Sequence, residues 1–138
     1  MSGNGERLLV LYFESYPSNL DYFRDFRGKT VEELKGTPKF IAHGTNVICA
    51  INGIVMHLNE PAILVEVVKK VGYSHGRRQI TIQALTELKA TILKLFQEKL
   101  KTKYNQEVEK IWSKTLDIIM QVFQAGVQEH INDHKSDS

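Results

Sequence analysis

Two histidines attract attention because each lies on an apolar helical pattern. His43 belongs to the apolar stripe of FIAHGTNV (40–47), and His75 follows Val71 by one turn in VGYSHGRR (71–78). A neutral imidazole can bind a transition metal. Taken singly, each histidine is more often a hydrogen-bonded or half-exposed side chain than a ligand. Two of them on consecutive apolar helices could face each other across a flat apolar cavity, and a haem with one imidazole on its iron fits such a cavity.

The other motifs offer no competing chemistry. The chain has no glycine-rich phosphate loop, no H-E-x-x-H zinc motif, no C-x-x-C-H haem-attachment motif and no recognisable nucleophile arrangement. We expect His57, His130 and His134 to be solvated surface histidines. The single cysteine, Cys49, cannot form an internal disulfide, and we expect it to be a small buried hydrophobic side chain.

The composition is that of an ordinary globular domain. The chain has 138 residues, of which 42% are hydrophobic and 25% charged, and a formal net charge of +2. So small a charge, scattered among carboxylates, does not favour nucleic acid or an anionic membrane as a partner. The apolar run 8–13 is too short for a signal-peptide core, and no apolar run approaches the ~20 residues of a membrane span. We therefore expect a cytoplasmic protein.

The apolar spacing predicts helices throughout, so the expected fold class is all-α with six to seven helices. The first helix should stop before Pro17, because the residue before a proline resists the α conformation. Thr30-Val-Glu-Glu is a capping box, and Thr37-Pro38 is a second helix start. The remaining expected elements are a short helical piece ending near residue 23, helices over 38–58, 61–75, 82–100 and 108–131, and a turn over 76–81.

Several segments resemble an animal globin in their order and spacing. YFESYPSNLDYFRDF (12–26) is similar to the segment that ends the family's second helix and carries the phenylalanine that packs on the haem, here Phe23. KFIAHG (39–44) resembles the start of the distal helix, and SHGRRQI (74–80) resembles the proximal site. The likeness is closest to the insect intracellular globins, and it implies a globin fold around a haem pocket.

Two later segments extend the resemblance. QALTELKATIL (83–93) matches the family's next helix, and Trp112 stands where many invertebrate globins carry an aromatic residue early in the last helix. The likeness covers residues 5–131, and we expect residues 1–131 to form one globin domain, with residues 132–138 as a solvated tail.

The resemblance implies a non-covalent haem b and a role for each site residue. His75 would be the proximal iron ligand, with Ser74 and a helix carbonyl accepting its other ring N–H. His43 would be the distal residue, donating a hydrogen bond to O₂ or binding iron as a sixth ligand. Phe23 would stack on the porphyrin edge with Phe26 behind it. The other expected pocket residues are Leu9, Phe13, Val47, Val68, Val71, Ile80, Leu85, Leu88 and Ile92, and the expected cations for the haem propionates are Arg24, Arg77 and Arg78.

The sequence departs from the family pattern at its start. The family's usual first helix is expected to be absent, because the likeness begins near Gly5 with only MSGN before it. That helix normally covers apolar side chains of the last helices, so we expect an exposed apolar patch on residues 108–127. The protein is then either a monomer with this patch uncovered or a homodimer that buries it.

Three functions remain open from the sequence. The first is reversible O₂ binding for storage, transport or sensing, with CO and NO as further ligands and no enzymatic activity. The second is a haem redox enzyme, such as a nitric-oxide dioxygenase or a peroxidase-like enzyme, which would need a reductase partner. The third is a haem-free helical interaction module, which the missing first helix would favour.

Overall fold

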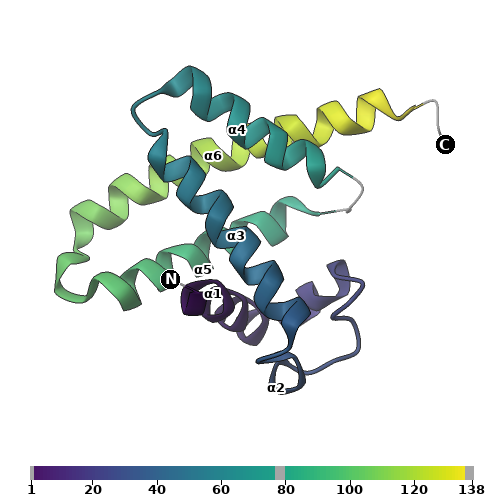
Figure 1. Ribbon diagram of the computed structural model, residues 1–138. Helices are drawn as coiled ribbons and strands as arrows, with labels where there is room; N and C mark the ends of the chain where they lie inside the picture. The colour runs from purple at the N-terminus through teal and green to yellow at the C-terminus, as the bar shows by residue number, and fades with distance from the viewer. Residues whose placement is uncertain (1, 77–79, 136–138) are drawn as a thin grey trace.

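The computed structural model describes residues 2–76 and 80–135, and every regular element in these ranges is helical (Figure 1). The all-α fold class is therefore confirmed. The α-helices are α1 (Ser2–Ser15), α2 (Val31–Leu34), α3 (Pro38–Met56), α4 (Pro61–Ser74), α5 (Ile82–Leu100) and α6 (Gln106–Asp133), and the two 3-10 helices are η1 (Pro17–Tyr22) and η2 (Lys101–Lys103).

Local signals explain most of the helix starts. Thr30 forms the expected capping box, in which its side chain accepts from the Glu33 N–H while the Glu33 side chain accepts from the Thr30 N–H. Proline occupies the first turn of η1, α3 and α4, where a backbone N–H has no hydrogen-bond partner within the helix, so its absence in proline costs no hydrogen bond. Thr81 and Asn105 cap α5 and α6 by accepting backbone N–H groups three residues on.

Two expected boundaries need comment. α6 begins two residues before the predicted start at 108 and ends two residues after the predicted end at 131. Residues 132 and 133 of the predicted tail are therefore helical. Asn105 explains the earlier start, because its side chain accepts from the N–H of Val108 at 2.9 Å and caps the helix there. Residues 77–79 of the predicted turn lie outside the described residues.

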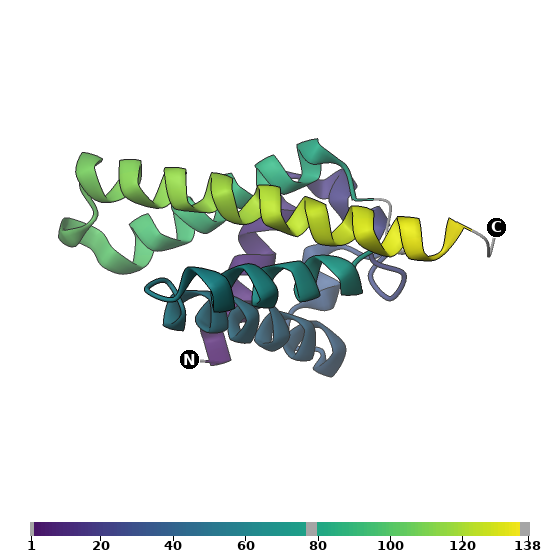
Figure 2. The same ribbon diagram turned by 90° about the horizontal axis from the view of Figure 1, so that it is seen from above.

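The helices cross where glycines allow close approach. α4 and α6 run side by side (Figure 2). A Cβ added to Gly72 would lie 2.1 Å from the Phe123 carbonyl oxygen, and one added to Gly126 would lie 2.2 Å from the Lys69 carbonyl oxygen. α1 crosses α3 in the same way, since a Cβ on Gly5 would lie 2.2 Å from the Gly44 carbonyl oxygen. Only glycine permits these backbone contacts.

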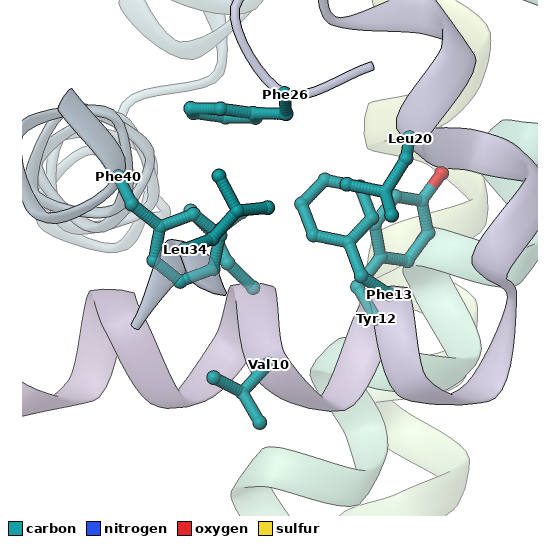
Figure 3. Packing of buried hydrophobic residues seen from close by; sticks show 8 residues of the cluster. Val10, Tyr12, Phe13, Leu20, Phe26, Leu34 and Phe40 are labelled. Atoms are coloured by element: carbon teal, nitrogen blue, oxygen red, sulfur yellow. The ribbon is translucent and has the colours of Figure 1, made fainter. Parts of the chain in front are cut away.

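The core has two parts. An aromatic cluster joins α1 to η1, α2, α3 and the intervening loop, and Figure 3 shows its rings converging; its buried members are Leu9, Val10, Tyr12, Phe13, Leu20, Phe26, Leu34 and Phe40. An aliphatic cluster joins α1, α4, α5 and α6, and its buried members are Leu8, Leu11, Val68, Ile92, Leu95, Leu116 and Ile119. Both clusters contain residues of α1, and Leu88 packs against both. Together they hold the surrounding helices against α1.

The N-terminal part of α6 carries exposed apolar side chains. Ile111 is 57% exposed and Ile118 is 52% exposed. Both lie within 108–127, the segment on which the sequence predicts an uncovered apolar patch. The exposed Lys114 lies between them, so the two side chains do not form a continuous apolar patch, and the predicted patch stays a prediction.

Candidate functional site

His43 projects from the N-terminal third of α3 toward the aromatic rings of the loop after η1. Its half-buried ring meets Phe23 edge-on at a centroid distance of 5.1 Å and Phe26 at 5.8 Å. Phe23 and Phe26 in turn stack on each other and meet Phe13 of the core edge-on. Because these rings are held by the core, the position of the His43 imidazole is fixed from one side.

His75 lies at the C-terminal end of α4, where it is the capping residue. Its Nδ1 is 2.7 Å from the carbonyl oxygen of Val71 and 3.3 Å from the Ser74 hydroxyl oxygen. A carbonyl oxygen only accepts, so Nδ1 must carry the hydrogen and donate. The lone pair of the neutral ring is then on Nε2, the nitrogen that can bind a metal. The predicted pair of acceptors, Ser74 and a helix carbonyl, is thus the pair that the structure provides.

One open cavity of about 1410 Å³ has His43 in its lining, whereas His75 is not a lining residue and its ring lies 5.3 Å from that of Phe123. His43, Ala42 and Asn46 line it from α3, and Ser74, the neighbour of His75, lines it from the end of α4. The loop after η1 supplies Phe23 and Phe26 and several charged side chains. A volume of this size exceeds that of most small-molecule pockets, and it can hold a flat cofactor of many atoms.

The structure divides the predicted pocket residues into three groups. The first lines the cavity: Phe23, Phe26 and His43, with Arg24 at the rim. The second is buried in the core, does not line the cavity and contains Leu9, Phe13, Val68, Leu85 and Ile92. The third is half-buried and contains Val47, Val71, Ile80 and Leu88. Arg77 and Arg78 lie outside the described residues.

The cavity rim also carries residues that the sequence analysis missed. Lys39 and Asn46 lie four residues before and three residues after His43, so helical spacing could have found them. Arg27 and Tyr22 come from η1 and the following loop. The Tyr22 hydroxyl donates to the Thr81 hydroxyl oxygen at 3.3 Å and bridges the rim between η1 and α5. No local sequence signal pairs residues so far apart.

Two predicted side-chain environments are wrong. Cys49 is exposed rather than buried, because it projects from the side of α3 that no other helix covers. His130 is not a solvated histidine: its half-buried ring packs edge-on against Tyr73 at 4.8 Å and stacks on His134 at 4.1 Å. A Cβ on Gly76 would overlap the His130 ring, so this packing also holds the residue after His75 in place.

Comparison with known proteins decides the family. The globin family model matches residues 6–123, which is most of the chain. This chain is a globin. A globin of Nerita albicilla is 27% identical to it over 125 residues, which are 91% of this chain and 80% of the relative.

Solved structures agree with this assignment. Haemoglobin of the botfly Gasterophilus intestinalis superposes with a TM-score of 0.85 at 24% identity, covering 93% of this globin and 87% of the botfly chain. A hexacoordinate haemoglobin of Drosophila melanogaster gives a TM-score of 0.80 at 26% identity, covering 88% of this globin and 80% of that chain. The fold is therefore that of invertebrate globins, and family membership implies haem as the cofactor.

Proposed function

We propose that this globin holds a non-covalent haem b through Nε2 of His75 and binds O₂ reversibly beside His43. The observation that carries the proposal is the contact of the His75 Nδ1 with the Val71 carbonyl oxygen at 2.7 Å. It fixes the tautomer and the orientation of the ring, which are the two conditions that an imidazole ligand must meet. A haem iron supplies the reversible binding of diatomic ligands.

The cavity suits haem in its chemistry as well as its size. Phe23 and Phe26 offer ring faces and edges to an apolar plate, and their own packing on Phe13 keeps them from collapsing into the space. Arg24, Arg27 and Lys39 supply cations at the open rim, where carboxylates of a cofactor would remain hydrated. The rest of the lining is mostly polar and includes Asp21 and Asp25, the second of which pairs with Lys39 at 3.7 Å, so Arg24 and Arg27 are the cations best placed for the haem carboxylates.

His43 would act on the ligand rather than on the cofactor. Its ring borders the cavity while Phe23 and Phe26 restrict its movement. An imidazole N–H held there would donate a hydrogen bond to a polarised diatomic ligand and slow its release. The Drosophila relative is described as hexacoordinate, which makes His43 the candidate for a second iron ligand when no external ligand is present.

The test is an absorption spectrum of the chain with haem, ferric and ferrous, with and without CO and O₂. We expect a strong Soret band that shifts with CO and that His75→Ala weakens or abolishes. His57→Ala is the matched control, since His57 lies at the far end of α3 beside Glu60, and it should leave the spectrum unchanged. The ferrous spectrum without ligand, compared with that of His43→Leu, reports whether His43 reaches the iron.

A different result would overturn the proposal. If the chain took up no haem, or if its Soret band were indifferent to His75→Ala, the globin fold would serve here only as a helical scaffold. The interaction-module hypothesis would then take precedence.

A further inference from the structure

The last turn of α6 carries two histidines that the haem site does not use. His130 and His134 are half-buried, and their rings stack with centroids 4.1 Å apart and planes 19° apart. The end of α6 extends past the end of α4, and neither histidine lines the cavity (Figure 2). Side chains four residues apart lie on the same face of a helix, so the two imidazoles are neighbours by position as well as by contact.

The His134 ring is oriented by the helix itself. Its Nδ1 lies 2.9 Å from the carbonyl oxygen of His130. A carbonyl oxygen only accepts, so Nδ1 carries the hydrogen and donates it. The lone pair of the neutral ring is then on Nε2, on the opposite side of the ring from that carbonyl. A histidine whose second nitrogen donates to a backbone carbonyl meets the usual requirement for a metal ligand.

The His130 ring is enclosed on its Nδ1 side. This nitrogen is buried and has no hydrogen-bond partner among the residues that the structure describes. The ring meets Tyr73 edge-on at 4.8 Å and lies against Gly76. A buried nitrogen without a partner is uncommon in folded proteins. Since Nδ1 is enclosed, an external ligand can reach this ring only through Nε2, and no hydrogen bond at Nδ1 prevents Nε2 from presenting its lone pair.

We propose that Nε2 of His130 and Nε2 of His134 together bind a divalent transition-metal ion that prefers imidazole, such as Zn²⁺. Two histidines four residues apart on one helix face are the ligand pair of helical zinc motifs. Within residues 2–76 and 80–135, no group of three or more metal-binding side chains occurs. Water therefore completes the coordination, and the ion is expected to exchange with solution rather than to be held permanently.

The stacked rings must turn to bind one ion. With planes only 19° apart, the two in-plane lone pairs point side by side rather than toward one point. Chelation requires both Nε2 atoms to lie about 2.0–2.1 Å from the metal. The torsion that turns an imidazole ring has a broad energy profile, so this rotation costs little. Metal binding should therefore open the stack, which gives the proposal a second observable.

The surroundings favour a cation and leave the imidazoles as its ligands. The C-terminal end of a helix carries a partial negative charge, which stabilises a cation at its last turn. The nearby carboxylates already have partners. Asp133 accepts from the Tyr73 hydroxyl at 3.0 Å, and Glu129 pairs with Lys69 at 3.4 Å.

Two other side chains could bind zinc and must be separated from this pair. Cys49 is an exposed thiol on α3. His57 lies 3.1 Å from Glu60 at the start of the next helix, so it combines one imidazole with one carboxylate. Both are remote in sequence from the end of α6, and each can be removed without touching His130 or His134.

The first test is calorimetric titration of the full chain, haem-loaded or as purified, with Zn²⁺. All samples carry Cys49→Ser, so that the exposed thiol does not bind the metal. We expect saturation at about one zinc ion per chain. His134→Ala should lower the association constant at least about tenfold, because one of two protein ligands is lost. His57→Ala is the matched control and should leave the titration unchanged.

His130 needs a more conservative variant because its ring packs against Tyr73 and Gly76. His130→Phe keeps an aromatic ring in this place and removes both nitrogens. It should weaken zinc binding as much as His134→Ala does. Thermal unfolding without zinc checks that both variants remain folded, and added zinc should raise the melting temperature of the wild type but of neither variant.

The second test follows the stack by proton NMR of the CO-bound ferrous chain, or of the as-purified chain if it takes up no haem. The ring signals of His130 and His134 should shift together on addition of zinc and saturate at one equivalent, because each ring leaves the face of the other. The ring signals of His57 should not follow this course.

Three outcomes would overturn the proposal. The first is the absence of saturable zinc binding. The second is binding that survives in both His134→Ala and His130→Phe, or that is lost in His57→Ala. The third is binding without a joint shift of the two ring signals, which would show that the histidines do not share one ion. The site lies outside the cavity, so each of these results would leave the haem proposal unaffected.

Discussion

Among single residues, Lys101 has the least favourable backbone. It links α5 to η2 with φ 52° and ψ −119°, a region that residues with a Cβ rarely adopt. We expect Lys101→Gly to raise the free energy of unfolding by about 0.5–1 kcal/mol, because the relief of strain exceeds the added flexibility of the unfolded chain. Urea denaturation measures this. Lys99→Gly, inside α5, should instead lower stability by about 1 kcal/mol; a similar loss in both variants would show that Lys101 is not strained.

Tyr12 should make stability sensitive to alkali. Burial raises the pKa of its hydroxyl well above the ordinary value near 10, aided by the neighbouring Glu87 carboxylate, and the hydroxyl donates to the Ala84 carbonyl oxygen at 3.0 Å. Above about pH 10 the unfolded chain loses this proton while the folded chain keeps it, so the free energy of unfolding falls by about 1.4 kcal/mol per pH unit from this group.

The measurement is urea denaturation of the wild type and of Tyr12→Phe between pH 7 and pH 11. The two proteins should differ by a constant amount up to about pH 9.5, and the wild type should then lose stability more steeply. Parallel curves over the whole range would contradict the assignment.

For single residues, the sequence predicted hydrogen-bond partners better than it predicted burial. The acceptors of the His75 ring could be inferred, because a residue four positions earlier in a helix must offer its carbonyl nearby. Cys49 was misplaced, since periodicity shows which residues share a face but not which face a neighbouring helix leaves uncovered. The Tyr22–Thr81 bridge joins the end of η1 to the start of α5, whose proximity only the folded chain creates.

At the level of helix packing, the contact between α4 and α6 should not tolerate a side-chain carbon atom at Gly126. A methyl group at Gly126 would meet the Lys69 carbonyl oxygen at 2.2 Å, so the helices would have to separate. We expect Gly126→Ala to lower the free energy of unfolding by about 1–3 kcal/mol and to shift the Soret band, because α4 carries His75.

Gly53→Ala is the control for this change. Its Cβ would meet nothing within 4 Å, and the added helix propensity of alanine should raise stability by about 0.5–1 kcal/mol. Thermal unfolding of both variants gives the comparison, and a neutral Gly126→Ala would mean that the two helices are less tightly packed than described.

Helix boundaries could be predicted where the chain supplies a cap or a proline. Helix α5 has the predicted limits, 82–100, because Thr81 caps its start. The start of α6 lies two residues before the predicted one, because Asn105 caps the helix there and a lone asparagine does not by itself mark a helix start. Crossing points such as Gly72 with Phe123 could not be predicted, because a glycine in a helical sequence does not indicate which other backbone segment it contacts.

For the molecule as a whole, α3 should be the element that depends most on the cofactor. It borders the cavity and buries only two residues, whereas α6 packs along α4 and contributes no residue to the cavity lining. Adding haem should therefore slow amide hydrogen exchange most in α3 and least in α6. Mass-spectrometric exchange with and without haem tests this. Equal protection of both helices would mean that the cofactor acts through global stability alone.

The arrangement of the helices in space is the part that periodicity could not supply. Apolar spacing gave the number and approximate limits of the helices, and the resemblance supplied their order around a pocket. The cavity itself depends on Phe13 and Phe40 supporting Phe23 and Phe26 from below, which is a property of packed rings rather than of any segment.

The crossing of α1 and α3 has a consequence for how this chain can diverge. At Gly5 and Gly44 each backbone lies where the other residue's side chain would begin. A mutation at one position cannot be rescued by a smaller residue at the other, because no smaller residue exists. Any substitution at either position therefore destabilises the crossing, so a lineage that keeps this fold must inherit both glycines unchanged. If both positions are randomised in a library, selection for the folded protein should recover glycine at both.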